Sequence, residues 1–465
     1  MSKTDTPVFV VTGAPNKGKS TFLKAMTNDP GIKVDEVART TTSSKPYHFK
    51  SGPDGETLLT LWDTPGFENA AGVYEIIRNW ESKSSEKPLE LIRRYVETYQ
   101  DDPYHQYETE IFKPLTGFAC IIYIADCSKS FSSADYLREI QLLQFTNLPR
   151  IAILNPIDGD QHLDSWREGL RAYFHNIKVF NPHKTTFDEK LSILGALSHL
   201  HDEWEKQING VIDKLKQDRE QVLRESARVI RNTVLRIYDE EFEIRFNGIK
   251  DEEEHKRELL SKARRFVTDT MNESQKEITE KFGFDVHISL NREYRENDLF
   301  SETVRKRHVS PAQRGFIGAV AGGSVGALID AAAGGLTFGV FTAIAGTGGY
   351  AAGYYSDFKP EDLINIKTYM NSDRKEVIQI KSLNIEIGFL IINRLRQVVS
   401  SLYNRTAANT EDIIIDKDLD NKSLLTISKL LAQISASKKE RYSESRKKEL
   451  LDFIHEKLVD DQRGK

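Results

Sequence analysis

The sequence predicts an α/β fold with a doubly wound, mostly parallel sheet, followed by a mainly α-helical region. Short apolar runs near the N-terminus alternate with helical patterns, and long polar helical patterns take over later. One glycine-rich apolar segment interrupts the second region. Strands that alternate with helices favour a parallel sheet covered on both faces. We therefore expect an α/β domain first and a helical region with a glycine-rich helical hairpin after it.

Five apolar runs rich in β-branched residues predict the strands of the sheet. They are residues 7–12, 57–63, 118–126, 150–155 and 177–181. Helical spacing follows the first run and recurs between the later ones. The connection between the second and third runs is unusually long and amphipathic. It predicts a helical insertion over about 67–115, in the kind of loop that often carries function.

Composition and charge argue against nucleic acid as a partner. The chain has 65 basic and 70 acidic residues and a net charge of −5, whereas nucleic-acid-binding domains usually carry a basic footprint. Cys120 and Cys127 lie in one apolar run and cannot build a disulfide framework. The N-terminus lacks the layout of a secretory signal. We expect a cytoplasmic protein.

A glycine-rich segment with the pattern GxxxxGK[ST] follows the first predicted strand and precedes a predicted helix. With the next threonine, its residues are Gly13, Ala14, Pro15, Asn16, Lys17, Gly18, Lys19, Ser20 and Thr21. The backbone N–H groups of such a loop bind phosphate, together with the N-terminus of the helix. Lys19 is expected to contact the β- and γ-phosphates, and the Ser20 hydroxyl to bind Mg2+. This segment predicts a nucleoside triphosphate site.

Two further segments complete the predicted site. The sequence DTPG follows the second strand, where Asp63 can hold Mg2+ through water and Gly66 can donate its N–H to the γ-phosphate. A threonine-rich segment upstream can order on the triphosphate and offer a hydroxyl to Mg2+. Thr41 is the favoured threonine and Thr40 the next choice. The predicted catalytic residues are Lys19, Thr41 and Gly66.

These motifs resemble those of a known family. The order and spacing of GAPNKGKS, the threonine cluster and DTPG are similar to the Era/TrmE-like, translation-factor-related P-loop GTPases. The whole chain looks like a bacterial branch that pairs such a GTPase with a C-terminal domain of unknown function containing a glycine-rich apolar stretch. The resemblance implies GTP as the ligand, Mg2+ as the cofactor and hydrolysis to GDP and phosphate. It also implies that Asn16 helps to bind an activating cation such as K+.

The base-reading motif matches the family only in part. The resemblance implies NKxD after the strand at 150–155, and the chain has Asn155-Pro156-Ile157-Asp158, without the lysine. Asn155 and Asp158 are the expected guanine-binding residues. The resembling branch itself departs from NKxD, so a chance match of Asp158 stays open. An NTPase without strict guanine preference stays open with it.

Phe67 follows DTPG, at the position where Ras-type relatives carry a glutamine that positions water. Hydrolysis is therefore expected to be slow without help from a bound cation, a partner protein, dimerisation or the insertion. A homodimer and an unidentified protein effector accordingly belong to the expected partners.

Residues 315–355 are rich in glycine and alanine and carry one charge, Asp330. Each half approaches the roughly 20 residues that cross a bilayer. Glycines recur at every fourth position, which favours close helix packing. Two interpretations stay open: a hairpin that inserts in or lies against a membrane at its inner face, and a hairpin packed inside a soluble domain.

The sequence therefore predicts four parts. They are a P-loop GTPase domain over 1–200, a helical domain over 201–310, the glycine-rich apolar hairpin over 311–356 and a C-terminal helical region over 357–465. The predicted function is a GTPase whose nucleotide state switches the helical C-terminal region. The alternative is a nucleotide-gated, membrane-associated or membrane-remodelling protein in which hydrolysis is secondary.

Overall fold

The computed structural model divides the chain into two compact units. The first comprises Met1–Asp218 with Asn404–Glu411, and the second Arg219–Tyr403 with Asp412–Lys465. The residues that the structure describes are 6–27, 41–50, 57–128, 130–131, 134–157, 159–246, 252–283, 364–370, 376–383, 385–405, 421–436 and 444–463.

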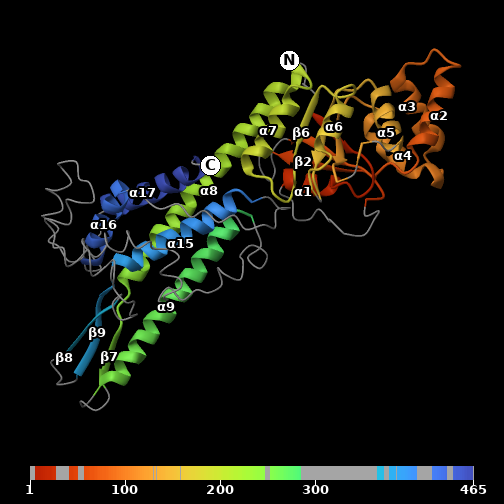
Figure 1. Cartoon of the computed structure of the whole chain (residues 1–465). Helices are drawn as coiled ribbons and strands as arrows, with labels where there is room; N and C mark the ends of the chain where they lie inside the picture. The colour runs from red at the N-terminus through yellow and green to blue at the C-terminus, as the bar shows by residue number, and fades with distance from the viewer. Residues whose placement is uncertain are drawn as a thin grey trace. The chain divides into compact units, whose positions relative to one another are not determined.

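The first unit contains a six-stranded sheet in the order β2-β3-β1-β4-β5-β6 (Figure 1). Its strands are β1 Val8–Thr12, β2 Lys45–Lys50, β3 Thr57–Asp63, β4 Cys120–Asp126, β5 Arg150–Asn155 and β6 Asn176–Val179. β2 pairs antiparallel with β3, and all other neighbours pair in parallel. The predicted fold class, an α/β domain with a mostly parallel sheet followed by a helical region, is confirmed.

Helices cover both faces of this sheet. They are α1 Lys19–Thr27, α2 Ala70–Glu81, α3 Pro88–Tyr99, α4 Gln106–Phe112, α5 Ala134–Phe145, α6 Leu163–Leu170 and α7 Phe187–Ser198, with single turns η1 Pro103–His105, η2 Lys113–Leu115 and η3 Asp202–Trp204. Along β1, Phe9 and Val11 enter the core cluster with α1 and α7, whereas Val10 enters the cluster with α2 to α6. The central strands are mostly apolar, as expected where neither face meets water.

The edge strand β2 was missed by the sequence interpretation. Its sequence, KPYHFK, contains Pro46 and two lysines, which weaken a strand pattern. At a sheet edge both residue types are tolerated, because one side of the strand needs no ladder partner. Tyr47 and Phe49 alternate along β2 and pack against the core, and this packing decides the register.

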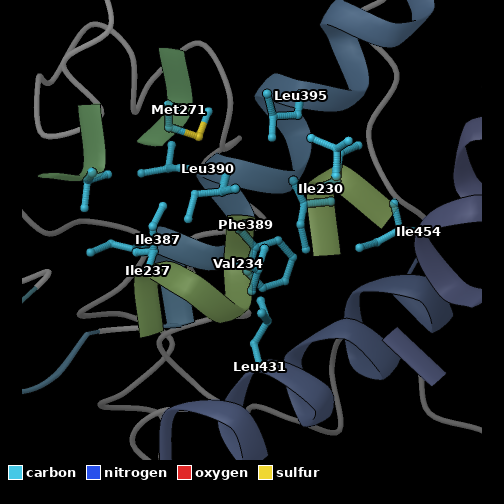
Figure 2. Close-up of a cluster of buried hydrophobic side chains, with 14 of the residues drawn as sticks. Ile230, Val234, Ile237, Met271, Ile387, Phe389, Leu390, Leu395, Leu431 and Ile454 are labelled. Carbon is cyan, nitrogen blue, oxygen red and sulfur yellow. The ribbon is translucent and has the colours of Figure 1, made fainter. Parts of the chain in front are cut away.

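The second unit combines a three-stranded antiparallel sheet, in the order β7-β9-β8, with long helices. Its elements are β7 Glu243–Phe246, α9 Glu252–Lys281, β8 Ile364–Met370, β9 Glu376–Leu383, α15 Ile385–Tyr403, α16 Asn421–Ala436 and α17 Glu444–Arg463. Helix α8, Glu205–Asp239, begins in the first unit and ends in the second. Figure 2 shows the core, where Ile230 and Val234 of α8 meet Phe389 and Leu390 of α15 and Leu431 of α16.

The regions expected to be helical over 201–310 and 357–465 thus also hold the three strands of this sheet, which the sequence interpretation missed. The expected hairpin at 311–356 lies outside the described residues. Among the helices that the structure does describe, none is both long and apolar enough to cross a membrane.

A buried ion pair joins α15 to α17 in the second unit. Arg396 donates from Nε to Asp461 Oδ2 over 3.1 Å and from Nη2 to Asp461 Oδ1 over 2.7 Å. Its Nη1 donates to Asn393 Oδ1 over 3.1 Å. The two charged side chains are only 7% and 4% exposed, so neither charge has water to replace its partner.

We expect Asp461→Ala to lower the free energy of unfolding by roughly 3 kcal/mol, because the Arg396 guanidinium would stay buried without its counter-charge. The exposed pair of Arg236 and Glu273 offers a matched control. Glu273→Ala should cost less than about 1 kcal/mol, since both side chains are solvated. Urea unfolding of the whole chain measures both changes, and equal losses would contradict the prediction.

Candidate functional site

The loop between β1 and α1 turns tightly over residues 13–20. Asn16 has φ 58° and Gly18 has φ 87°, both in the left-handed region that asparagine and glycine tolerate. At Gly18, a Cβ atom would lie 2.4 Å from Nδ2 of Asn155, so a larger residue does not fit. The loop leads into the N-terminus of α1, where unpaired backbone N–H groups attract anions.

Lys19 opens α1 and is buried beside the loop. Its Nζ donates to the carbonyl oxygen of Gly13 over 3.2 Å and to that of Ala14 over 2.8 Å. Burial lowers the pKa of Lys19 to about 8, although the charges of Asp63 and Glu139 oppose this shift. Both hydrogen-bond partners are neutral carbonyls, so an anion at the loop would stabilise the ammonium charge.

Three oxygen-bearing side chains converge next to Lys19. Ser20 Oγ donates to Asp63 Oδ2 over 2.8 Å, and Thr41 Oγ1 donates to the same oxygen over 3.3 Å. The Ser20 and Thr41 hydroxyl oxygens lie 3.3 Å apart. Parallel pairing of β3 with β1 sets Asp63 opposite Val11, directly before the loop. The structure thus brings together the three residues predicted to hold magnesium.

The environment of Asp63 fits a hard divalent cation. Its Oδ1 atom is buried and has no hydrogen-bond partner among the described residues. Burial raises the pKa of this carboxyl above its usual value, against hydrogen bonds from Ser20 and Thr41 and the charge of Lys19, which lower it. Carboxylate and hydroxyl oxygens are the ligands that Mg2+ prefers, with water in the remaining positions. The roles of these residues in binding stay predictions.

Gly66 lies against the loop on its other side. A Cβ atom at Gly66 would come within 2.4 Å of the Pro15 backbone nitrogen, so only glycine permits this approach. The next residue, Phe67, donates its backbone N–H to the Gly13 carbonyl over 3.4 Å. Its ring is 4% exposed and packs edge-to-face with that of Phe112, 6.1 Å between centroids. The Phe67 side chain is therefore part of the core.

Of the two residues predicted to bind the base, the structure describes Asn155 alone. Its Nδ2 donates to the Lys17 carbonyl over 3.1 Å, and its Oδ1 is buried without a partner among the residues described. This bond ties the end of β5 to the phosphate loop. Asp158 lies outside the described residues, and so does Thr40. Thr21, the last predicted nucleotide contact, is buried in α1.

A buried ion pair joins the phosphate loop to the end of β4. Lys17 Nζ lies 2.8 Å from Asp126 Oδ2, and the side chains are 10% and 7% exposed. Burial would lower the pKa of Lys17, but the hydrogen bond and charge of Asp126 raise it above its ordinary value. Burial would likewise raise the pKa of Asp126, yet hydrogen bonds from Lys17 and Ser128 hold it below the usual value. Both groups are charged at neutral pH.

Sequence reasoning missed this partner of Lys17, and it also missed Glu108 and Glu110. Asp126 ends a predicted strand, but its partner is 109 residues away in sequence. Glu108 and Glu110 contact the loops beside the site across 39 to 66 residues. The position of Asp126 at the end of a predicted parallel strand could have indicated that its carboxylate lies near the phosphate loop. We find no comparable sequence signal for Glu108 or Glu110.

We expect Asp126→Ala to lower the free energy of unfolding by roughly 3 kcal/mol, because Lys17 would keep a buried charge without a partner. The loss should be the same at pH 5 and 7 and no larger at pH 9, because without Asp126 burial lowers the pKa of Lys17 and favours release of its proton. In the wild type, the Asp126 charge contributes to the free energy of unfolding above the pKa that this group has in the unfolded chain. This contribution disappears as pH falls through its lower pKa in the folded protein. That of Lys17 disappears only as pH rises through its raised folded pKa.

The double variant Lys17→Met/Asp126→Leu is the control, since an apolar pair of similar volume should recover most of that loss. Urea unfolding at the three pH values measures both variants. A double variant no more stable than Asp126→Ala would contradict the role of the buried charge.

Comparison with solved structures returns matches of low similarity. A variant of Era from Aquifex aeolicus bound to GDP·AlF4− is 13% identical with a TM-score of 0.29, over 59% of this chain and 98% of that one. Era with MgGDPNP and a 16S ribosomal RNA segment is 13% identical with a TM-score of 0.29, over 56% and 88%. An oligomerised bacterial dynamin pair is 12% identical with a TM-score of 0.24, over 99% and 87%. Likenesses this weak support no functional conclusion.

No curated protein matches the chain significantly. Two family models do match it. Residues 8–125 match the family described as 50S ribosome-binding GTPase, which identifies a P-loop GTPase domain, one of a class that generally binds GTP with Mg2+. Residues 167–461, more than half of the chain, match the model described as domain of unknown function DUF3482. The chain therefore belongs to the DUF3482 family, and a P-loop GTPase domain precedes its family-defining region.

Proposed function

We propose that this protein binds GTP with Mg2+ and hydrolyses it to GDP and phosphate. The observation that carries the proposal is the convergence of Ser20, Thr41 and Asp63 beside the N-terminus of α1. The unsatisfied buried oxygen of Asp63 supports it, because a cation would satisfy that atom. Mg2+ supplies positive charge against the β- and γ-phosphates when bound, and these three residues would hold it.

The other site residues position the triphosphate. The loop amides before α1 and the Lys19 ammonium bind the β- and γ-phosphates, and Gly66 donates its backbone N–H to the γ-phosphate. Asn155 reads the base from the end of β5, with Asp158 as its proposed companion. The motifs that resemble the Era/TrmE-like GTPases favour guanine as that base.

Hydrolysis by this site is expected to be slow without assistance. The buried Phe67 ring packs against Phe112 and has no group that can orient a water molecule. We propose that a monovalent cation such as K+ at the exposed Asn16, a protein effector or a second copy of the chain assists hydrolysis in place of that group. The change of nucleotide would act on the helical region through α8, which runs from the first unit into the second.

Lys19→Ala is expected to weaken GTP binding at least about tenfold, since it removes a charge-assisted hydrogen bond to phosphate. Its melting temperature without nucleotide should not fall, because the buried Lys19 ammonium disfavours the empty folded state. Lys24→Ala, on the same helix but outside the loop, is the control. Affinity and base preference are measured by displacing fluorescent GTP with unlabelled GTP, GDP or ATP. The measurement is made once in Na+ and once in K+.

An unchanged affinity in Lys19→Ala would refute the phosphate site. Equal displacement by ATP and GTP would refute guanine selectivity while leaving the phosphate site intact. Phosphate release that is faster in K+ than in Na+ is the expected sign of a cation at Asn16.

The affinity for GTP should fall as pH rises from 8 to 9, by at most about tenfold. Burial lowers the pKa of Lys19 to about 8 in the nucleotide-free protein, so above that pH binding must return a proton to Lys19. A phosphate group with a second pKa of about 6 is already ionised in this range. Calorimetry in two buffers of different ionisation enthalpy should show almost no proton uptake at pH 7 and a large part of one proton at pH 9. Equal uptake at both pH values would contradict the assignment.

A further inference from the structure

Helix α4 of the insertion contacts both loops that flank the candidate site. It is short, Gln106–Phe112. Glu108 and Glu110 are two positions apart, which is a rotation of about 200° around the helix axis, so their side chains leave the helix on different sides. One glutamate contacts the segment after Gly66, and the other contacts the segment after Thr41. Gly66 is the residue proposed to contact the γ-phosphate, and Thr41 is one of those proposed to bind the magnesium ion.

Glu108 holds the segment after Gly66. Its Oε1 accepts the backbone N–H of Glu68 over 2.8 Å and that of Asn69 over 2.6 Å. Asn69 is the N-cap of α2, where a negative charge is favourable at the positive end of the helix dipole. The Glu108 residue is 1% exposed, so these backbone N–H groups replace water as partners of its carboxylate.

Glu110 holds the segment after Thr41 by two bonds to one residue. Its Oε2 accepts the Ser44 backbone N–H over 2.8 Å, and its backbone carbonyl accepts the Ser44 hydroxyl over 2.6 Å. Ser44 precedes β2 and lies three residues after Thr41. The Glu110 side chain is 15% exposed and also pairs with Lys113.

The core keeps α4 itself in place. The Phe112 ring at its end packs edge-to-face with Phe67, 6.1 Å between centroids, and with Tyr95 of α3, 5.6 Å between centroids. Buried interiors are close-packed and resist displacement. Neither loop can therefore leave its position without breaking hydrogen bonds to a helix that the core already holds.

We propose that Glu108 and Glu110 are positioning residues for the triphosphate: through α4 they hold Gly66 and Thr41 where the γ-phosphate and Mg2+ meet them. This inference rests on the proposed GTP site. Neither glutamate touches the nucleotide. A diphosphate is bound by the phosphate loop and the base-binding residues, which α4 does not contact through these bonds. Loss of either glutamate therefore weakens binding of the triphosphate and spares the diphosphate.

The test compares affinities for a non-hydrolysable GTP analogue with Mg2+ and for GDP. Glu108→Ala removes the carboxylate that accepts the Glu68 and Asn69 backbone N–H groups, and the analogue should bind about tenfold more weakly. GDP affinity should stay within about twofold of the wild type. Glu108→Gln keeps an oxygen that accepts both N–H groups and should restore most of the analogue affinity. Glu110→Ala should shift the same ratio in the same direction.

Glu90→Ala is the matched control. Glu90 lies in the same insertion and accepts the Lys87 backbone N–H at the start of α3, away from both loops. This variant should leave the ratio of the two affinities unchanged. If Glu108→Ala fails to fold, Ser44→Ala serves in its place, since it removes only the hydroxyl bond to the Glu110 carbonyl.

Hydrogen exchange without nucleotide provides a second measurement. The backbone N–H groups of Glu68 and Asn69 should exchange faster in Glu108→Ala, and that of Ser44 faster in Glu110→Ala. Equal losses for both nucleotides would indicate a structural role only and overturn the inference, and so would unchanged affinities in variants of a GTP-binding wild type. A wild type that binds neither nucleotide would overturn the proposed function and the inference together.

Discussion

Burial of the Asp63 carboxylate is the constraint on which the nucleotide-binding domain depends. A carboxylate away from water is costly unless hydrogen bonds or a cation compensate it. Ser20 and Thr41 satisfy one of its oxygens and leave the other without a partner among the described residues. Burial also raises its pKa, which means that these surroundings disfavour the charged form. A bound cation would relieve this cost, so ligand binding and stability of this domain should be linked.

Residues near in sequence and residues far in sequence both position the parts of the candidate site. The loop, with its glycines and Lys19, comes from one strand–loop–helix unit, and Asp126 and Asn155 tie it to the ends of β4 and β5. The two flanking segments are different, since their positions depend on hydrogen bonds to α4 of the insertion. Phe67 belongs to that same arrangement, because its ring joins the core with Phe112. The residue at the position expected for a glutamine is thus packed against the insertion.

Among the residues that the structure describes, each unit contains an ion pair that is almost completely buried and joins distant segments. Lys17–Asp126 supports the phosphate loop of the first unit, and Arg396–Asp461 joins α15 to α17 in the second. Buried pairs of this kind often add little net stability compared with apolar residues, but a single unpaired member is very costly.

The sequence by itself determined the elements whose signals are local. The apolar runs of β1, β3, β4 and β5 predicted a parallel sheet, and GxxxxGK[ST] between a strand and a helix predicted the phosphate loop. Asp63 and Gly66 followed from their position after a buried strand. Such features need only neighbouring residues, so pattern and propensity suffice to predict them.

Only the tertiary structure decided the contacts that depend on residues far apart. β2 carries Pro46 and two lysines and becomes a strand because β3 offers it an edge. The sheet of the second unit pairs β7 with β9, more than a hundred residues later in the chain. Glu108 and Glu110 look like solvated charges on a short helix. They are placed against backbone N–H groups because packing of Phe112 fixes where α4 lies, and no local pattern encodes that packing.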